Sequence, residues 1–405
     1  MGEISFFSLD QGLFFYIMRP NEVQLSRMHL AVAQEIGRSM ADELYTQTIA
    51  AAEEKLLRFL QTFESVQENM HIGLEESQAQ LREVVGDMFP TLLAELAQSS
   101  PPESLSQFHG AFGAVIRHFG NSAEAFLNPG DRDISLASLD SRRALYRGIA
   151  ILYKYRIYLS SLQSYWLLPE ALPNLDALET ISPDADAPVG MINNKGTDAH
   201  ADYSLYVPEN YSPQKNWPLI ICLHGAYGRG DHYIWSWLRP AKSKGYMLLS
   251  PKSVDVTWSV LRPAIDVRSI TTMFEEVCQT YAVDRSRVYL TGLSDGGTYT
   301  YLLGLYRSEM FAGIAPIAGD FHYMIDDLLH QKQGIELPIY IVHGAHDHIF
   351  PVESIRDGHK LLTRIGYNST YEELPDWGHA HTSSVNEELV FPWFESLSPK
   401  SRSPD

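Results

Sequence analysis

The stretch VYLTGLSDGGTYTYLL, residues 288–303, decides how the chain folds around it. It holds the pattern Gly-x-Ser-x-Gly as Gly292-Leu293-Ser294-Asp295-Gly296, placed after an apolar run. This pattern is typical of a sharp strand-to-helix turn, which lifts a serine hydroxyl clear of a sheet while the glycines let backbones pass closely. The start of the helix also favours a developing negative charge. We therefore expect Ser294 to be a nucleophile at such a turn.

Alternation of strands and helices extends on both sides of this turn, from residue 189 to 397. Continuous apolar runs such as 219–223 are typical of strands that are covered on both faces. The succession predicts an α/β domain with a mostly parallel central sheet. The predicted strands are 189–193 and 203–207 as a hairpin, 219–223, 247–250, 287–291, 311–317, 339–342 and 370–374, and the predicted helices are 267–281, 296–307, 352–365 and 385–397.

The segment His224-Gly225-Ala226-Tyr227-Gly228 directly follows the strand predicted at 219–223. In a sheet with a serine turn of this kind, this loop supplies one backbone N–H to an oxyanion hole, and the residue after the serine supplies the other. We assign the amides of Ala226 and Asp295 to this role, with Tyr227 as the alternative to Ala226. An ordinary turn at the exit of a strand is the competing interpretation.

A serine nucleophile needs a general base, and the base needs an acid that orients it. Both follow in the chain, because Asp347 comes after the strand predicted at 339–342 and His379 after the strand at 370–374. The order Ser294, Asp347, His379 predicts a catalytic triad at the carboxyl ends of the strands. The alternatives are Asp320 or Asp326 as the acid and His381 as the base.

These motifs together resemble a known family over 189–397, about half of the chain. The span is similar to the α/β-hydrolase superfamily, and more narrowly to the phospholipase/carboxylesterase group of serine esterases and their polyhydroxyalkanoate-depolymerase-like relatives. The resemblance implies hydrolysis of a small-molecule carboxylic ester or thioester through an acyl-enzyme, without a cofactor. Asp295 departs from the family, which often has glutamine or alanine there. The matching stretches are PLIICLHGAYGRG, VDRSRVYLTGLSDGGTYTYLLG, FAGIAPIAG, LPIYIVHGAHDHIFP and LPDWGHAH.

Two other functions stay open. A serine peptidase of the oligopeptidase type shares the fold, but such enzymes commonly carry a β-propeller or a cap, whereas the N-terminal half here has helical periodicity. The second is an inactive hydrolase scaffold fused to a helical interaction module, against which an intact triad in the right order argues.

The first 168 residues have a different character. Apolar residues recur at helical spacing from 21 to about 98, from 103 to 126 and from 136 to 168, without a sustained heptad. We expect an all-α domain over 1–168, with a cap over the active site, self-association and binding of a protein partner as its candidate roles. A Pro-rich acidic linker at 169–188, a hydrolase domain at 189–397 and a frayed tail at 398–405 complete the predicted organisation.

The chain of 405 residues is acidic, with 31 Lys and Arg against 50 Asp and Glu and a net charge of −19. This surplus disfavours binding of nucleic acid by bulk charge. Two cysteines, Cys222 and Cys278, cannot form a disulfide framework. The apolar stretch 4–18 lacks the basic flank of a leader, and no run of about 18 uncharged apolar residues occurs. We therefore expect no integral membrane segment and a cytoplasmic location.

Four tryptophans fall in predicted loops at the carboxyl ends of the strands, namely Trp235, Trp237, Trp258 and Trp377. We take Tyr227, Trp258 and Trp377 as candidate substrate-binding residues, because α/β sites are built from such loops. Packing of the loops onto the core is the competing interpretation.

A metal site is an alternative for the segment that holds His343, His346, Asp347 and His348. The His-x-His-x-Asp-His pattern of metallo-β-lactamase-like hydrolases would need its second histidine at Ala345. We therefore expect no metal at this segment.

One basic stretch stands out in the acidic chain. Arg142, Arg143, Arg147, Lys154 and Arg156 occur with no acidic residue between them and are interleaved with tyrosines. Contact with anionic lipid or an acidic partner is one interpretation. Packing against acidic helices of the same bundle is the interpretation we favour.

Overall fold

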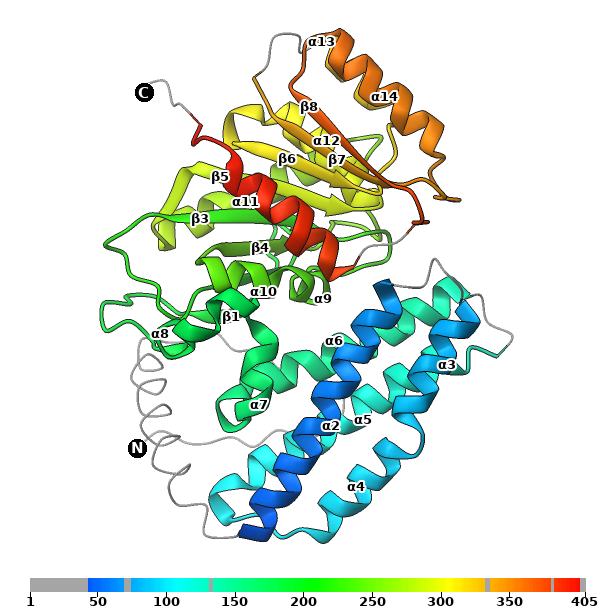
Figure 1. Ribbon diagram of the computed structural model, residues 1–405. Coiled ribbons are helices and arrows are strands. Elements are labelled where there is room, and N and C mark those ends of the chain that lie inside the picture. The colour runs from blue at the N-terminus through cyan, green and yellow to red at the C-terminus, as the bar shows by residue number, and fades with distance from the viewer. Residues whose placement is uncertain (1–42, 69–73, 131–133, 332–335, 380–381, 401–405) are drawn as a thin grey trace.

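The computed structural model describes residues 43–68, 74–130, 134–331, 336–379 and 382–400. The helical pattern predicted at 21–42, the apolar stretch 4–18, His381 and the last five residues of the predicted tail lie outside the described residues. Within these ranges a helical part comes first and an α/β part follows (Figure 1).

The α/β part is built on one sheet of eight strands in the order β1-β2-β4-β3-β5-β6-β7-β8. β2 pairs with β1 and with β4 in antiparallel fashion, and the other neighbouring pairs are parallel. The predicted fold class is therefore confirmed. The strands are β1 (Gly190–Asn194), β2 (Tyr203–Val207), β3 (Trp217–Leu223), β4 (Met247–Pro251), β5 (Val283–Leu293), β6 (Gly313–Ile317), β7 (Ile339–Gly344) and β8 (Ser369–Leu374).

The two faces of the sheet belong to two hydrophobic clusters. Leu219, Ile221 and Leu223 of β3 pack in one of them, and Ile220 and Cys222, which point to the opposite face, pack in the other. The second cluster continues without a break into the helical part, so the two parts share a core. The first face is covered by α11 (Ala264–Thr280), α12 (Asp295–Tyr306), α13 (Tyr323–Gln331) and α14 (Val352–Arg364).

Two helices form where the sequence predicted loops, α9 (Gly230–Tyr233) and α10 (Trp235–Lys244). Pro240 lies inside α10 and indicates a helix break, because proline has no N–H to donate to the carbonyl four residues earlier. That carbonyl, of Ser236, instead accepts a 2.8 Å hydrogen bond from the side chain of Asn386. Asn386, far along the chain, therefore supplies the hydrogen bond that Pro240 cannot donate to the Ser236 carbonyl.

The closing helix differs from the α-helix predicted at 385–397. Residues Val385–Val390 form a π-helical segment, and only then does α15 (Phe391–Ser396) begin. Pro392 lies in the first turn of α15, where a proline needs no N–H and favours the start of a new helix. Asn386, which reaches Ser236, lies in the π-helical segment. The wide turn therefore coincides with the contact that stabilises α10.

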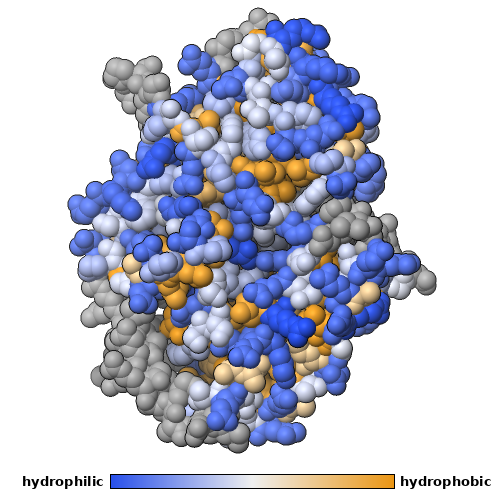
Figure 2. Space-filling model, viewed as in Figure 1, coloured by the Kyte–Doolittle hydropathy of each residue, from blue (hydrophilic) through white to orange (hydrophobic). Residues whose placement is uncertain are grey.

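Two helices of the helical part end before a proline or glycine pair, as the sequence pattern predicts: α4 ends at Gln98, before Pro101-Pro102, and α5 ends at Leu127, before Pro129-Gly130. The helix predicted at 136–168 is shorter, because α6 ends at Lys154 and short turns with α7 (Ser160–Gln163) follow. No helix within the described ranges is long and apolar enough to cross a membrane, and Figure 2 shows a mostly hydrophilic face with separate hydrophobic patches. The helices are α2 (Glu43–Glu68), α3 (Leu74–Val85), α4 (Met88–Gln98), α5 (Ser106–Leu127) and α6 (Ile134–Lys154).

A buried ion-pair network joins the helical part to the α/β part. Glu209, which is 4% exposed, accepts hydrogen bonds from Arg156 at 2.7 Å, Lys242 at 2.6 Å and Tyr153 at 2.6 Å. Burial acts to raise the pKa of Glu209, but the charges of Lys242 and Arg156 outweigh it and lower that pKa to about 2. Glu179 also pairs with Arg156 and Lys242.

This network corrects one prediction and qualifies another. Arg156 ends the basic stretch, and its acidic partners lie outside the bundle, so packing against acidic helices of the same bundle is wrong for this residue. Its partner Glu179 ends α8 (Leu175–Glu179), which lies inside the predicted linker 169–188. That segment is therefore held by ion pairs, while the domain limits stay a prediction.

A second charged contact predicts how stability depends on pH. Arg239 of α10 lies between Glu64 of α2, at 2.8 Å, and Glu387 of the π-helical segment, at 3.0 Å. Burial raises the pKa of Glu387 from 4.5 to about 7, against the opposing charge of Arg239. Since the folded chain holds this proton more tightly than the unfolded chain, its contribution to stability is complete below about pH 4.5 and is lost as the pH rises through about 7.

We therefore expect the free energy of unfolding to fall between about pH 5 and pH 7.5, and to fall less in a Glu387→Gln variant. Urea unfolding of both proteins at the two pH values measures this difference. Glu388→Gln, at the exposed neighbouring position, is the matched control and should keep the original pH dependence. Equal pH dependence in the original chain and in Glu387→Gln would contradict the prediction.

Candidate active site

Ser294 lies at the sharp turn that the sequence predicted between β5 and α12. Its φ of 58° and ψ of −122° are strained for a residue with a side chain. A Cβ atom on Gly292 would lie 2.3 Å from the Gly296 carbonyl oxygen, and a Cβ on Gly296 would lie 2.4 Å from that of Leu223. Both glycines of the pattern are therefore required by close backbone contacts.

A hydrogen-bonded relay joins the three residues of the predicted triad. His379 Nε2 lies 2.9 Å from Ser294 Oγ, and His379 Nδ1 lies 2.7 Å from Asp347 Oδ2. Since a carboxylate only accepts, Nδ1–H donates to Asp347 and Nε2 is left to accept the serine hydroxyl. The three residues come from the ends of β5, β7 and β8, which are near one another because those strands run parallel.

The surroundings of Asp347 favour the ionised form of its carboxyl group. Its side chain is fully buried, and its Oδ1 accepts the amides of Ile349 and Phe350, each at 2.8 Å. Burial acts to raise the pKa of Asp347, but the hydrogen bond from His379 and these amides outweigh it, so that the pKa lies below its usual value. A carboxylate in this state can stabilise a positive charge on the imidazole.

The other acids do not contact His379. Asp326 pairs with His330 at 3.3 Å, on the exposed side of α13. Asp320 follows β6, and burial raises its pKa above the usual value. Neither carboxylate has a hydrogen bond to His379 within the described residues, so the structure brings Asp347 and not these two to the imidazole.

The two amides assigned to the oxyanion hole are unoccupied donors. Among the hydrogen bonds of the described chain, neither the Ala226 N–H nor the Asp295 N–H donates to a carbonyl. The alternative donor is excluded, because the Tyr227 amide donates to Val256 O at 3.1 Å. Tyr227 also adopts a positive φ of 56°, which is uncommon for a residue with a side chain. The assignment of the Ala226 and Asp295 amides to an oxyanion hole stays a prediction.

His224 fixes the loop that carries Ala226. Its Nδ1 donates to the Gly225 carbonyl at 2.7 Å, and its Nε2 accepts the Ser253 amide at 3.2 Å. Burial lowers the pKa of His224 to about 4, which keeps the ring neutral and suits this pattern. The Trp258 indole donates to the His224 carbonyl at 2.7 Å. The loop is therefore held from both sides before any substrate arrives.

The aromatic candidates fall in different places. Trp258 is 2% exposed and contacts the loop at 224–228 through the His224 carbonyl, so it positions this loop, and its contact with a substrate stays a prediction. Trp235 and Trp237 lie on α10 and not in a loop, and Trp237 is fully buried. Trp377 is half-buried, and its carbonyl accepts the His346 amide at 2.8 Å. Tyr227 is 64% exposed and is free to meet a ligand.

Two contacts of the loops that carry Asp295 and His379 were not predicted from the sequence. Thr257 donates to the Asp295 carboxylate at 2.6 Å, which ties the residue after the serine to the loop that follows β4. Ser384, beyond His379, donates its amide to Glu68 of α2 at 3.2 Å. The loop of the base is therefore anchored to the helical part.

His343, one of the four residues considered as an alternative metal site, makes a contact with the protein backbone. Its buried ring donates Nε2–H to the Phe350 carbonyl at 2.9 Å. Burial also lowers the pKa of His343. The ring therefore supports the turn that presents the two backbone amides to Asp347.

Exposed apolar side chains gather at the edge of the sheet where the relay lies. Within the described residues, seven of the nine large exposed hydrophobic side chains follow the carboxyl ends of β3, β4, β6 and β7. We call these residues the apolar rim. They are Tyr227, Val254, Val256, Leu261, Ile265, Tyr323 and Ile349.

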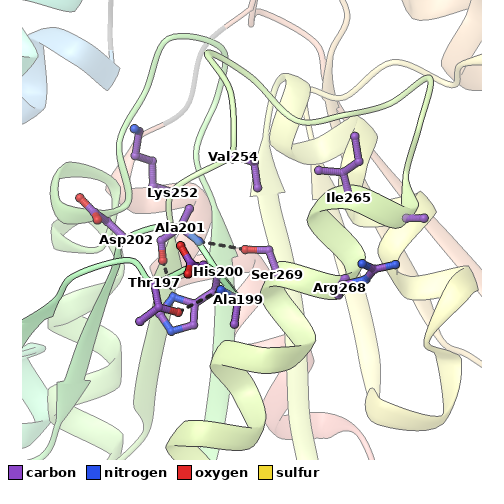
Figure 3. A pocket seen from close by; sticks show the side chains of 12 residues that line it. Thr197, Ala199, His200, Ala201, Asp202, Lys252, Val254, Ile265, Arg268 and Ser269 are labelled. Atoms are coloured by element: carbon purple, nitrogen blue, oxygen red, sulfur yellow. Dashed lines mark hydrogen bonds between the residues drawn. The ribbon is translucent and has the colours of Figure 1, made fainter.

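A separate cavity of about 560 Å³ lies between the β1–β2 loop, the loop after β4 and the start of α11 (Figure 3). None of the three residues of the relay lines it. Its His200 is already engaged, with Nε2 2.9 Å from Glu276 and Nδ1 2.6 Å from the Ala201 carbonyl. This cavity is distinct from the place where Ser294, His379 and Asp347 meet.

The chain is similar to curated esterases. It is 28% identical to a bifunctional acetylxylan esterase/xylanase of Neocallimastix patriciarum over 162 residues, 39% of this chain and 23% of that protein. It is 26% identical to a probable feruloyl esterase C of Aspergillus oryzae over 192 residues, 45% of this chain and 68% of that protein. It is 29% identical to a poly(3-hydroxyalkanoate) depolymerase C of Paucimonas lemoignei over 116 residues, 26% of this chain and 28% of that protein.

The chain thus spans about a quarter of the first relative's length and about two thirds of the second's. A thermostable esterase of known structure is 24% identical, with a TM-score of 0.43, over 51% of this chain and 62% of that chain. No protein-family model matches the chain. The sheet, the serine turn and the curated relatives are consistent with the α/β-hydrolase superfamily that the sequence resembles.

Proposed function

We propose that this chain is a serine hydrolase that cleaves carboxylic esters or thioesters through an acyl-enzyme intermediate. The relay from Asp347 through His379 to Ser294 is the single observation that carries the proposal. A serine hydroxyl is a weak nucleophile by itself, and this arrangement supplies the base and the buried carboxylate that activate it.

In the acylation step, Ser294 Oγ attacks the carbonyl carbon of the ester while His379 Nε2 takes the hydroxyl proton. Asp347 stabilises the resulting imidazolium, and the amides of Ala226 and Asp295 donate to the oxyanion. His379 then gives the proton to the departing alcohol or thiol, and the acyl group stays on Ser294.

In the deacylation step, a water molecule takes the place of the leaving group. His379 removes its proton, and the water oxygen attacks the acyl carbon of the Ser294 ester. The proton returns to Ser294 Oγ as the acid departs. The same two amides stabilise the second oxyanion, so that no cofactor enters either step.

The surroundings of the relay favour a substrate with an apolar or aromatic portion. The apolar rim, apart from Val254 and Ile265, which line the separate cavity, offers exposed apolar surface that an apolar group of a substrate would cover. Two of the relatives have names that point the same way, the feruloyl esterase and the poly(3-hydroxyalkanoate) depolymerase, whereas the name of the acetylxylan esterase indicates an acetate ester. We therefore extend the proposal to aryl and longer acyl esters rather than acetate esters alone.

Labelling with a fluorophosphonate probe tests the proposed nucleophile. We expect the folded chain to be labelled at Ser294, because the probe reacts with serines that a neighbouring histidine activates. Mass spectrometry of the digested protein locates the label. Ser294→Ala should remove it, and Ser354→Ala, at an exposed serine of α14, should not. A folded chain without label at Ser294 would contradict the proposal.

The same protein separates esterase from peptidase activity. If the proposal holds, 4-nitrophenyl acyl esters are hydrolysed and aminoacyl arylamides are not. Cleavage of the arylamides without cleavage of the esters would favour the oligopeptidase type instead.

A further inference from the structure

The basic stretch of α6 faces the loop that carries a proposed oxyanion donor. Arg143 donates from Nη2 to the Tyr227 carbonyl at 3.3 Å, and Tyr227 directly follows Ala226. The Tyr146 ring stacks on that of His232, with centroids 6.2 Å apart. Since His232 lies on α9, this face of the helical part is next to the site (Figure 1).

The positive charges on this face are only partly neutralised. Arg143 forms an ion pair with Asp140 at 3.3 Å, in which both side chains are more than a third exposed. Arg142 and Arg147 pair with no acidic side chain of the described chain. In a protein with a net charge of −19, cations left without partners beside a catalytic loop need a reason.

The groups of α9 do not cancel these charges. Asp231 is already paired with Arg229 at 2.8 Å. Burial lowers the pKa of His232, the charge of Asp231 acts to raise it, and the charges of Arg229, Arg147 and Arg143 lower it. Three guanidinium groups and one carboxylate therefore act on this ring.

A carboxylate lies on the other side of the oxyanion loop. Asp320 follows β6, which lies beyond β3 and β5 in the sheet, away from β4, whereas the Asp295 carboxylate accepts the Thr257 hydroxyl of the loop after β4 at 2.6 Å. The two ends of the site thus differ in charge, with arginines near the Tyr227 carbonyl and the carboxylate of Asp320 near the end of β6. A substrate with one charged end would bind in a single direction.

We infer that Arg142, Arg143 and Arg147 form a cationic wall of the active site that binds a negatively charged group on the ester substrate. This inference rests on the proposed function. It assigns the helical part a direct role in choosing the substrate, because all three arginines lie on α6. Guanidinium groups suit this role, since they donate in pairs to a carboxylate.

The contacts set the distance between the anion and the reacting carbonyl. One peptide unit separates the Ala226 amide from the Tyr227 carbonyl, and Arg143 lies one hydrogen bond beyond it. With about 3 Å for each of the three hydrogen bonds and about 4 Å for the peptide unit, the anion lies at most about 13 Å from the oxyanion when these steps are extended, and roughly half as far when they fold back. A half-ester of adipic acid has its free carboxylate near the lower end of this range.

The test compares esters that differ only in charge. One pair carries the charge on the acyl side, namely 4-nitrophenyl hydrogen adipate and its terminal carboxamide. The other pair carries it on the leaving group, namely 4-acetoxybenzoate and 4-acetoxybenzamide. We expect kcat/KM for the anion to exceed that for its neutral partner about tenfold in one of the pairs, as charge-assisted hydrogen bonds allow. The preference should shrink in 0.5 M salt, since salt screens exposed charges.

Arg142→Gln/Arg147→Gln should lower the ratio of kcat/KM for the anion to that for its neutral partner about tenfold, mainly by raising KM for the anion. Arg117→Gln, on the exposed side of α5, removes one positive charge elsewhere in the helical part and should leave the preference unchanged. A preference near one in both pairs, or the same preference in the double variant, would overturn the cationic wall. Labelling of Ser294 in the same samples separates that result from failure of the proposed function, in which Ser294 would not react.

Discussion

Ser294→Ala is expected to lower kcat for an aryl ester by about 10⁴- to 10⁶-fold, the scale found when a triad serine is removed. The loss is this large because His379 and Asp347 have no other hydroxyl to activate in the relay. The hydrolysis rate of 4-nitrophenyl butyrate at saturating substrate, divided by the enzyme concentration, gives kcat for both proteins. Adding His379→Ala should cost little more, since residues that act as one unit are not additive.

Asparagine variants at two positions distinguish the acids. Asp347→Asn should lower kcat about 10⁴-fold, because the imidazole loses its orientation and its counter-charge. Asp320→Asn should change kcat far less, because no hydrogen bond joins Asp320 to His379 in the described chain. The reverse result would assign the acid to Asp320 and contradict the relay as drawn.

Lys242→Met should destabilise the folded chain by about 3–5 kcal/mol, as expected when one partner of a buried ion pair is removed. Lys242 is 1% exposed and contacts both Glu209 and Glu179. Without it, the buried carboxylate of Glu209 and the half-buried carboxylate of Glu179 share the positive charge of Arg156 alone. Unfolding by guanidinium chloride at neutral pH, read from tryptophan fluorescence, measures the loss.

Two further variants make this result specific. Lys244→Met, on the same helix, breaks only partly exposed ion pairs with Glu170 and Glu395 and should cost at most about 1 kcal/mol. Lys242→Met/Glu209→Gln removes one positive and one negative charge and should recover part of the loss. If Lys242→Met and Lys244→Met were equally stable, the network would not stabilise the contact between the two parts.

The sheet could be predicted from the sequence because its signals are local. The apolar run at 219–223 and the alternation of strands and helices are read from neighbouring residues. The errors have distant causes. Pro240 indicates a helix break, so that α10 is not predicted from the local sequence. The contact that permits this helix comes from Asn386. The helix predicted to reach 168 ends at Lys154, and Arg156 just beyond it binds Glu179 and Glu209.

In the candidate site, too, the features with local signals were predicted, whereas those that depend on distant contacts were not. Ser294, Asp347 and His379 were predicted together because each follows a strand, and parallel strands end at one edge. The Tyr227 amide was not predicted to be occupied, since its acceptor is the carbonyl of Val256 in another loop. The burial of Trp258 depends on how that loop folds back over the sheet. Self-association or a protein partner of the helical part stays a prediction.

The contact between Glu68 and Ser384 also has a consequence for synthesis of the chain. These residues are 316 positions apart, and the ion pair between Glu64 and Arg239 spans 175. At about 5–20 residues per second, the ribosome needs about 16–63 s to deliver Ser384 after Glu68 has emerged. During that interval the α/β surface that covers the shared core of the bundle is incomplete. A nascent chain of this protein therefore exposes apolar surface for a period in which chaperones have time to bind.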